Sequence, residues 1–358
     1  MKREIGSEFW IDKNKLILDS DETPSWLNRF GNVVLTTSGR GALSLLLEQV
    51  KPRVKRVLLP SYICDSVILP FEQAGYELTY YDVDKYLKPI DIDVIKNSNV
   101  GIFLHMGYFG FSTNEILSDL ISSLKSESVI TIEDVTHTLF SQCNKPIESD
   151  FIIGSIRKWF GIPSGGFLAS DKTINFELID ANVDFINIRR SSLNQKFEYM
   201  RSGNESIKST YLSGFNRAEH ILDEDIRPYK IDRESEVIIK NLDNKELQIV
   251  RQRNYDFLLK HLRVVDGIEV IFNDVENDVI PMFFPIYVKS NRDELRRKLI
   301  ENEIYCPVHW PIPKQVNGHL NITTKNIYDS ILSIPCDQRY QIEDMRRIIN
   351  GIVSFFEE

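Results

Sequence analysis

The sequence predicts an α/β protein in which a mostly parallel central sheet carries helices on both faces and is followed by a small C-terminal α+β domain. Three observations lead to this prediction. The chain has 358 residues, which suits two domains at roughly 150 residues each. From residue 31 onward, short apolar runs alternate with amphipathic stretches, as is typical of βα units. The connecting stretches are of helix length, and parallel strands require such crossovers.

The first half of the chain reads as strand and helix in turn. The strands are predicted at residues 32–35, 56–59, 77–83, 101–104, 129–132, 151–156 and 166–169. The helices between them are predicted at residues 41–50, 65–74 and 115–124. We place this half in a large domain, residues 31–245, preceded by an N-terminal segment, residues 1–30.

The second half is mainly helical from residue 174 to residue 262 and then mixed. Its last amphipathic stretch, residues 246–262, opens a small domain that covers residues 246–358. In that domain we expect strands at residues 269–272, 282–288, 305–308 and 330–334, and helices at residues 292–303 and 342–356.

Composition excludes several classes of protein. The formal charge is −9 and no block of basic residues is present, so sequence-independent nucleic-acid binding is not expected. No apolar run approaches ~18 residues, and the N-terminus has no continuous apolar core, so we expect neither a membrane span nor a secretory signal. The cysteines Cys64, Cys143, Cys306 and Cys336 are far apart, which favours reduced thiols in the cytoplasm over a metal site.

The segment SGRGAL, residues 38–43, lies between the first predicted strand and the first predicted helix. A glycine-rich turn at a helix N-terminus exposes unpaired N–H groups and the positive end of the helix dipole, which together suit a phosphate. Taken alone, a tight turn that needs glycine for its backbone angles is the simpler interpretation. The segment matches neither the dinucleotide-binding fingerprint nor the phosphate loop of nucleotide hydrolases.

A second segment ends the strand predicted at residues 129–132 with Glu133 and Asp134, at the sheet edge where open α/β proteins bind ligands. A carboxylate there can hold a proton on a ring nitrogen, and His137 can face the same crevice. The alternative is that Asp134 caps the next helix and His137 packs in a turn.

A third segment delivers Lys158 into a loop that contains Trp159, Phe160 and Ile162. Burial among such side chains disfavours an ammonium ion, so we expect a partly desolvated and nucleophilic amine. The alternative is a solvated lysine in a basic turn, beside Arg157.

Together, in this order, the three segments provide what pyridoxal 5′-phosphate (PLP) requires. The glycine turn takes the phosphate, and Ser155 can add a hydroxyl to it. Asp134 keeps the pyridine nitrogen protonated, so that the ring can act as an electron sink. Lys158 forms the Schiff base and later transfers the proton.

The chain resembles the DegT/StrS-type sugar aminotransferases, a branch of the fold-type-I PLP enzymes. The resembling segments are SGRGAL (38–43), LLPSYICDSVILPFEQAGYELTYYDVD (58–84), YFG (108–110), ITIEDVTH (130–137), GSIRKWFGIPSGGFL (154–168), RQRNYDFLLKHL (251–262), VHWPIP (308–313) and LSIPCDQRY (332–340). Their order and spacing over about 300 residues make the resemblance specific.

This resemblance implies the fold-type-I fold, small-molecule substrates and a homodimer with each site at the subunit boundary. It also implies PLP-binding roles: phosphate contacts from Gly39, Arg40 and Ser155, a partner of the pyridine nitrogen at Asp134, a neighbour of the ring oxygen at His137, and the Schiff-base lysine at Lys158. His309 lies in the segment that the family places near the substrate entrance; the alternative is a histidine that fills the domain interface.

Several positions depart from the family pattern. Ser155 and Lys158 are three residues apart, where the family has five. Cys64 stands where the family has an aromatic residue that covers the cofactor, so Tyr62 or another ring has to take that role. Arg40 replaces a threonine, which leaves backbone N–H groups and its guanidinium to meet the phosphate. The family's asparagine-containing segment has no clean match; residues 214–217 look similar, while spacing points to residues 228–230.

The sequence therefore predicts a PLP-dependent aminotransferase that moves an amino group from an amino acid such as glutamate to a keto sugar, nucleotide-linked, in surface polysaccharide or secondary-metabolite synthesis. Two alternatives stay open. One is another PLP-dependent reaction on the same fold, which the unusual lysine loop motivates. The other is a catalytically silent binding partner, against which the presence of both Asp134 and Lys158 argues.

Overall fold

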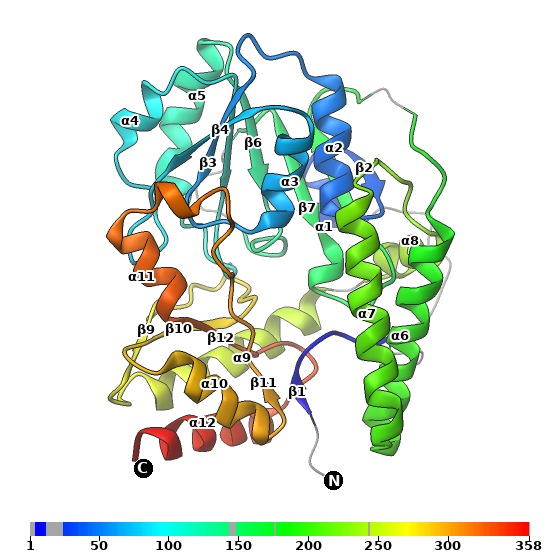
Figure 1. Cartoon of the computed structure of the whole chain (residues 1–358), viewed down its shortest axis with the longest axis vertical. Helices are drawn as coiled ribbons and strands as arrows, with labels where there is room; N and C mark the ends of the chain where they lie inside the picture. The colour runs from blue at the N-terminus through cyan, green and yellow to red at the C-terminus, as the bar shows by residue number, and fades with distance from the viewer. Residues whose placement is uncertain (1–3, 12–23, 143–147, 175–176, 243, 358) are drawn as a thin grey trace.

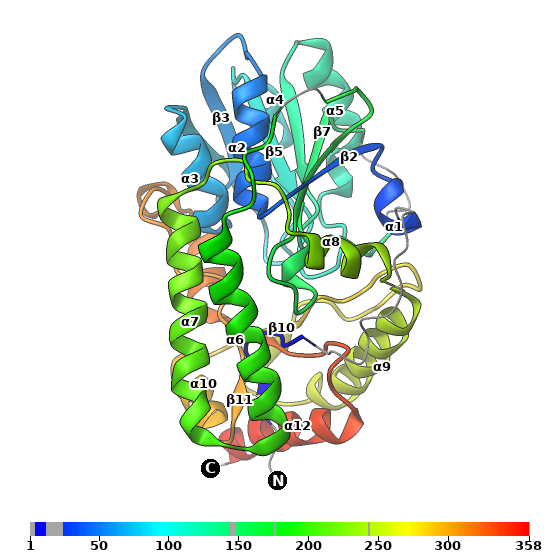
Figure 2. The same ribbon diagram turned by 90° about the vertical axis from the view of Figure 1, so that its right-hand side faces the viewer.

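The computed structural model of the chain describes residues 4–11, 24–142, 148–174, 177–242 and 244–357, and Cys143 lies outside these ranges (Figure 1). The described chain forms an upper layer around a seven-stranded sheet and a lower layer around a three-stranded sheet, with a pair of long helices along one side (Figures 1 and 2). None of the helices in these ranges is both long and apolar enough to cross a bilayer.

The seven-stranded sheet confirms the predicted mostly parallel core. Its spatial order is β2 (Asn32–Thr36), β8 (Gly166–Ser170), β7 (Phe151–Ser155), β6 (Ile130–Asp134), β5 (Ile102–Met106), β3 (Arg56–Pro60) and β4 (Glu77–Tyr81). All neighbours pair in parallel except β8, which runs antiparallel to both β2 and β7. The last residues of β6 and β7, Asp134 and Ser155, therefore lie at the same edge.

Helices cover both faces of this sheet because its strands are apolar on both sides. On β3, Val57 and Leu59 pack with the residues of α2 (Gly39–Gln49) and α3 (Asp65–Gln73), whereas Leu58 packs on the opposite side. The opposite face carries α4 (Ile92–Lys96) and α5 (Ser118–Ser126). The helix predicted at residues 115–124 begins as a short 3₁₀ turn, Glu115–Leu117, before α5.

The turn before α2 is held in place by close backbone packing. Ser38 caps α2, since its Oγ accepts a hydrogen bond of 3.1 Å from the N–H of Gly41. A Cβ built on Gly166 would lie 2.1 Å from the carbonyl carbon of Ser38, so only glycine fits there. The first strand-to-helix turn thus rests directly on β8.

The predicted helical region consists of α6 (Val183–Ser202), α7 (Glu205–Glu224), α8 (Arg233–Lys240) and α9 (Asn244–Leu262). α6 and α7 form an antiparallel hairpin, and Gly203 ends α6 with a φ of 67°. Figure 2 shows this hairpin running from the large sheet down to the small one. α1 (Ser25–Asn28) is a single turn.

The lower layer is the predicted α+β region. Its sheet has the order β12 (Ile331–Ile334), β10 (Phe284–Val288), β9 (Ile268–Val270), all antiparallel, with α10 (Arg292–Glu301), α11 (Ile322–Ser330) and α12 (Ile342–Glu357). The strand predicted at residues 305–308 is wrong in extent. It is the two-residue β11 (Ile304–Tyr305), which pairs in parallel with β1 (Ile5–Gly6) from the N-terminus.

Candidate active site

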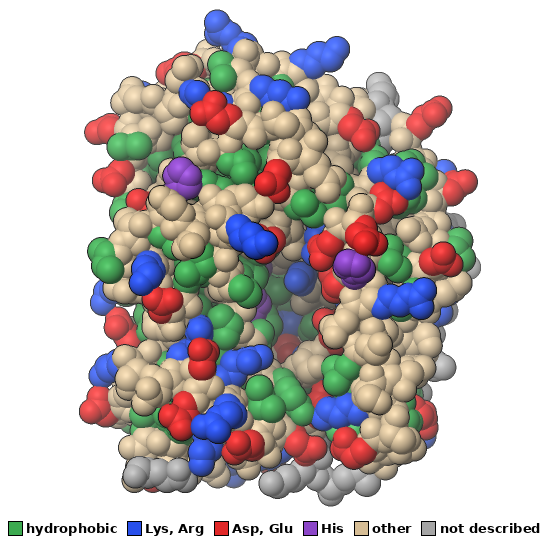
Figure 3. Space-filling view, in the orientation of Figure 1, with side chains coloured by type: hydrophobic (Ala, Val, Ile, Leu, Met, Phe, Trp, Pro, Cys, Tyr) green, Lys and Arg blue, Asp and Glu red, His purple; other side chains and the backbone are tan. Residues whose placement is uncertain are grey.

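A cavity of about 560 Å³ lies at the carboxyl edge of the large sheet. The large sheet, the hairpin α6–α7, the N-terminal segment and the lower layer all contribute to its lining. In Figure 3 it appears as a hollow near the middle of the face, beside α7 and above α10, with charged side chains inside and around it. Asp134, Lys158, Ser155, His137 and His309 all line it.

Asp134 is the last residue of β6 and is 4% exposed. Its Oδ1 accepts a hydrogen bond of 2.8 Å from the N–H of Thr136. Burial raises the pKa of Asp134, against the lowering effect of the Thr136 hydrogen bonds and the Lys158 charge. A buried carboxylate with so little cationic compensation is well suited to receive a proton-bearing nitrogen.

Lys158 ends the 3₁₀ turn Ile156–Lys158, which directly follows β7. The structure differs from the expected desolvation: Trp159 and Ile162 are fully buried on the protein side, whereas the Lys158 side chain is exposed and lines the cavity. Trp159 points away because its indole Nε1 donates to the carbonyl of Thr136 at 2.7 Å. The lysine therefore reaches the cavity rather than sinking into the aromatic cluster.

The glycine turn and Ser155 meet at the same cavity wall. A Cβ built on Gly39 would lie 3.4 Å from the Cβ of Ser155, which places the N-terminus of α2 next to the Ser155 hydroxyl. The guanidinium of Arg40 is already engaged, by Ser66 Oγ at 3.0 Å and by Asp223 at 3.1 Å. The Arg40 guanidinium is thus paired within the protein, contrary to the expectation that it is available to a phosphate. A phosphate at this wall would meet the backbone N–H groups of the turn and the Ser155 side chain.

His137 and His309 both line the cavity, and their rings pack edge to face with centroids 5.8 Å apart. The Nδ1 of His137 accepts a hydrogen bond of 3.3 Å from the N–H of Phe109, and burial lowers the pKa of His137 to about 3. His309 Nδ1 contacts Ser333 Oγ at 2.8 Å, and burial also lowers the pKa of His309. Both rings are therefore neutral at pH 7.

Tyr62 does not line the cavity and so is not in a position to cover a ring there. It is fully buried, and its hydroxyl donates to the carbonyl oxygen of His309. Among the described residues, four Phe, Tyr and Trp side chains do line the cavity: Phe9, Phe283, Tyr305 and Trp310. The Trp310 ring lies 5.1 Å from the Tyr62 ring and 5.3 Å from the His137 ring. Cys64 does line the cavity as a free thiol, and burial raises the pKa of Cys64 while the Lys158 charge opposes that rise.

A cluster of charged residues that sequence reasoning missed forms the wall next to Lys158. Glu219 of α7 receives two hydrogen bonds from Arg157, the longer being 3.0 Å, and one of 3.1 Å from Arg189 of α6. Arg189 also contacts Glu8 at 3.1 Å. Burial alone raises the pKa of Glu219, but the arginines hold it well below its usual value. These residues lie far apart along the chain, so no local pattern reveals them.

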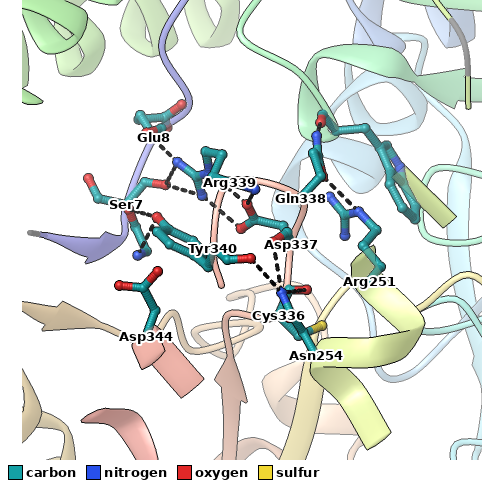
Figure 4. A network of polar contacts seen from close by, with 12 residues as sticks. Ser7, Glu8, Arg251, Asn254, Cys336, Asp337, Gln338, Arg339, Tyr340 and Asp344 are labelled. Carbon is teal, nitrogen blue, oxygen red and sulfur yellow. Dashed lines mark hydrogen bonds and ion pairs between the residues drawn. The ribbon is translucent and has the colours of Figure 1, made fainter. Parts of the chain in front are cut away.

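The N-terminal segment is fixed to the cavity by Arg339. Figure 4 shows Arg339 between this segment and Asp337: it donates to the carbonyl of Glu8 at 2.9 Å and contacts Asp337 at 2.7 Å. Its guanidinium also lies 3.9 Å from the ring centroid of Phe9. Arg339 therefore holds residues 6–9 along the cavity.

The two segments considered for the family's missing asparagine motif lie apart. Gly214 is inside α7, where a Cβ would lie 2.1 Å from Ser192 Oγ of α6, so it serves the packing of the hairpin. Tyr229 and Lys230 instead accept hydrogen bonds from Thr37 through their carbonyls, at 2.9 and 2.6 Å. The segment at residues 228–230 therefore lies beside the glycine turn of the same chain.

The side chains that line the cavity carry an excess of positive charge, in contrast to the negative charge of the whole chain. Seven cationic and four anionic side chains line it among the described residues, although the chain as a whole carries a formal charge of −9. The cations are Arg40, Arg157, Lys158, Arg189, Arg251, Arg296 and Arg339, and the anions are Glu8, Asp134, Glu219 and Asp337. A cavity of this charge favours anionic ligands.

No protein-family model and no curated protein matches this sequence. Solved structures do match. DesV of S. venezuelae, in complex with a ketimine intermediate, is 15% identical over 94% of this chain and 88% of its own, with a TM-score of 0.66. PseC of Helicobacter pylori, an aminotransferase involved in pseudoaminic acid biosynthesis, is 14% identical over 99% of this chain and 100% of its own, with a TM-score of 0.67.

A third match is the putative sugar aminotransferase Spr1654 of Streptococcus pneumoniae in its PMP form. It is 14% identical over 99% of this chain and 98% of its own, with a TM-score of 0.68. The predicted fold class is confirmed by matches of this length. The chain has the fold of the DegT/StrS-type sugar aminotransferases.

Proposed function

We propose that this protein is a PLP-dependent aminotransferase of the DegT/StrS type that acts on a keto sugar. One observation carries the proposal: a buried carboxylate, Asp134, and a cavity-facing amine, Lys158, line one cavity at the carboxyl edge of the sheet, beside a helix N-terminus. The fold shared with known sugar aminotransferases supports it.

The residues present fit PLP. The phosphate would be held by the N-terminus of α2, at Gly39, and by the Ser155 hydroxyl, which meet at one wall. The ring nitrogen would lie against Asp134, whose raised pKa reflects a carboxylate short of cationic partners. The aldehyde carbon would be held by Lys158. His137, neutral and buried, would lie beside the ring.

When bound, PLP supplies an electron sink that lets a proton leave the carbon next to the transferred nitrogen. The chain's own residues set the conditions for this chemistry. Asp134 holds the proton on the ring nitrogen, because a buried carboxylate is stabilised by a cation beside it. The Lys158 amine carries the proton to and from the reacting carbon as a general base and acid. Trp310 and the neutral rings of His137 and His309, which contact one another, would line the site beside the cofactor ring.

The substrate is proposed to be a keto sugar that carries a negative charge, in a nucleotide-linked form, with an amino acid such as glutamate as the donor. The excess of cations around the cavity supports an anionic substrate. We also propose a homodimer and a place in surface polysaccharide or secondary-metabolite synthesis. Light scattering of the purified protein checks the first of these.

The test is an absorption spectrum of the protein as purified and again after addition of PLP. Bound cofactor on Lys158 gives an absorption band in the near-visible range, and L-glutamate should then shift that band as the amino group moves to the cofactor. Lys158→Ala should lack the initial band, whereas Lys172→Ala, an exposed lysine on the same domain, should keep it. A colourless wild-type protein after PLP addition would overturn the proposal.

A further inference from the structure

We propose that Arg296 holds the phosphate or diphosphate group of the substrate at the open side of the cavity. This inference rests on the proposed function, because it assigns the anionic end of the keto sugar to one side chain. The observation behind it is the state of the seven cations that line the cavity: most have their charge matched already by groups of the protein.

Four of the arginines are paired with carboxylates. Arg157 and Arg189 share Glu219, and Arg189 also contacts Glu8. Arg40 contacts Asp223 and Glu219, and Arg339 contacts Asp337. The side chains of these four arginines are 10% exposed or less. Binding a substrate anion there would require an internal carboxylate to leave.

Two further cations are also committed. Arg251 is 1% exposed, and it donates to Gln338 Oε1 at 2.8 Å and to the carbonyls of Pro281 and Met282 at 2.9 Å. It also lies 4.5 Å from the ring centroid of Trp159, so its function is to join the two layers. Lys158 is assigned to the cofactor. Arg296 is left as the cation available to a second anion.

Arg296 lies on α10 and is exposed, but a hydrogen bond fixes the orientation of its guanidinium. Its Nε donates a hydrogen bond of 3.1 Å to the carbonyl of Cys306, just after β11. Among the described residues, none accepts a hydrogen bond from its two terminal nitrogens. Because Nε is anchored and Arg296 lines the cavity, the terminal pair forms a preoriented fork at the opening.

The surroundings of this fork suit a phosphate. Tyr305, Cys306 and Pro307 line the cavity beside it and carry no negative charge. The nearby Lys208 amine of α7 contacts Glu4 at 3.1 Å and donates to the Tyr305 hydroxyl at 2.8 Å, so its charge is already matched within the protein. A guanidinium fork binds a phosphate through two parallel hydrogen bonds.

The experiment compares Arg296→Gln with Arg297→Gln in the PLP-loaded protein. Arg297 is the next residue of α10, is 65% exposed, does not line the cavity and pairs with Glu294 at 3.1 Å. Both variants lose one positive charge from the same helix, so long-range electrostatic effects are matched. Binding of UDP and of glucose 1-phosphate is measured by calorimetry at constant salt, and the absorption of bound PLP reports that each variant is folded and loaded.

We expect Arg296→Gln to weaken binding of at least one probe by roughly 10- to 100-fold, as the loss of a charge-assisted hydrogen-bonded contact implies. Arg297→Gln should bind within about twofold of wild type, since its pair is exposed. A loss for UDP alone identifies a nucleotide diphosphate as the natural anion, and a loss for both probes identifies a phosphate of any origin. Equal affinities in the wild type and both variants would overturn the proposal.

Failure of this proposal is distinguishable from failure of the proposed function. The glutamate-induced spectral shift of the wild-type protein tests the aminotransferase without involving Arg296. If that shift occurs and UDP binds both variants equally, the proposed aminotransferase function is retained and the proposed role of Arg296 is wrong. If the wild type takes up no PLP, the proposed function is wrong, and the role of Arg296 is rejected with it.

Discussion

The two walls of the cavity are built differently. The wall made by the large sheet consists of strand ends, and its chemical groups Asp134, Ser155 and Lys158 come from one stretch of 25 residues. The opposite wall joins the N-terminus, the hairpin α6–α7 and the lower layer, and its groups Glu8 and Arg339 are 331 positions apart in the sequence.

This difference separates chemistry from recognition. The sheet wall has few charged side chains, and these line the same cavity. Backbone hydrogen bonds between strands hold it in place. The assembled wall is a network of ion pairs whose members are satisfied by one another. We therefore expect substitutions in the sheet wall to remove catalysis with little loss of stability, and those in the assembled wall to reduce stability or substrate affinity.

The largest effect is expected for Lys158→Ala. Without the amine, the proton transfer at the reacting carbon loses its acid and base, and turnover should fall by roughly ten-thousand-fold. The near-visible absorption should also disappear, while the circular dichroism stays that of wild type because the side chain is exposed. Wild-type turnover in this variant would contradict the assignment of catalysis to the sheet wall.

Asp134→Asn should reduce kcat/KM by roughly 100- to 1,000-fold, because an amide cannot hold the proton on a ring nitrogen. The control is Glu133→Gln. Glu133 precedes Asp134 on β6 but does not line the cavity, and it accepts a hydrogen bond of 3.1 Å from Asn114. Steady-state kinetics with glutamate as donor measure both variants; equal losses in the two would exclude a specific role for Asp134.

Arg339→Ala tests the assembled wall. It leaves Asp337 buried without its cation, so the free energy of unfolding should fall by about 3 kcal/mol. Hydrogen exchange at residues 5–9 should rise because their clamp is lost. Urea denaturation of Lys289→Ala provides the comparison: Lys289 pairs with Asp266 at the surface, and a change under about 0.5 kcal/mol is expected. Similar values for both would contradict the clamp.

Glu219→Gln should lower stability by about 2 kcal/mol at pH 7. The arginines depress the pKa of Glu219 in the folded state, against burial, so its carboxylate contributes stability above its ordinary pKa and loses it as the pH falls. The gap between wild type and variant should therefore begin to close below about pH 4 and narrow further as the pH falls toward the depressed pKa of Glu219. Glu224→Gln, 67% exposed on the same helix, should show no such gap.

Tyr62→Phe is expected to have the smallest effect. It removes the hydrogen bond to the His309 carbonyl but keeps the ring that packs against Trp310. The free energy of unfolding should fall by about 1 kcal/mol. PLP absorption should not change, because Tyr62 packs behind the cavity wall and does not line the cavity. A lost PLP band in this variant would mean that the Tyr62 hydroxyl is needed for PLP binding.

The sequence predicted the sheet wall well because strands end where their apolar runs end. The position of Asp134 follows from the run at residues 130–133, and the carboxyl edge of a parallel sheet then fixes its neighbours. The same local pattern failed for Lys158, since the aromatic residues after it face the core while it faces the cavity. It named Tyr62 or another ring to cover the cofactor; Tyr62 lies outside the cavity lining and Trp310 within it, because ring proximity across 248 positions is not a local property.

The sequence by itself determined the order along the chain of the strands of the large sheet, the parallel core and the carboxylate and lysine at its edge, but it missed β1, α4 and α11. Each feature that it determined depends on periodicity or on residues close together along the chain. Only the tertiary structure decided which arginines are matched by Glu219, Glu8 and Asp337, and therefore which cation is left for a ligand. Charge pairing depends on distances in space between segments that the fold alone brings together.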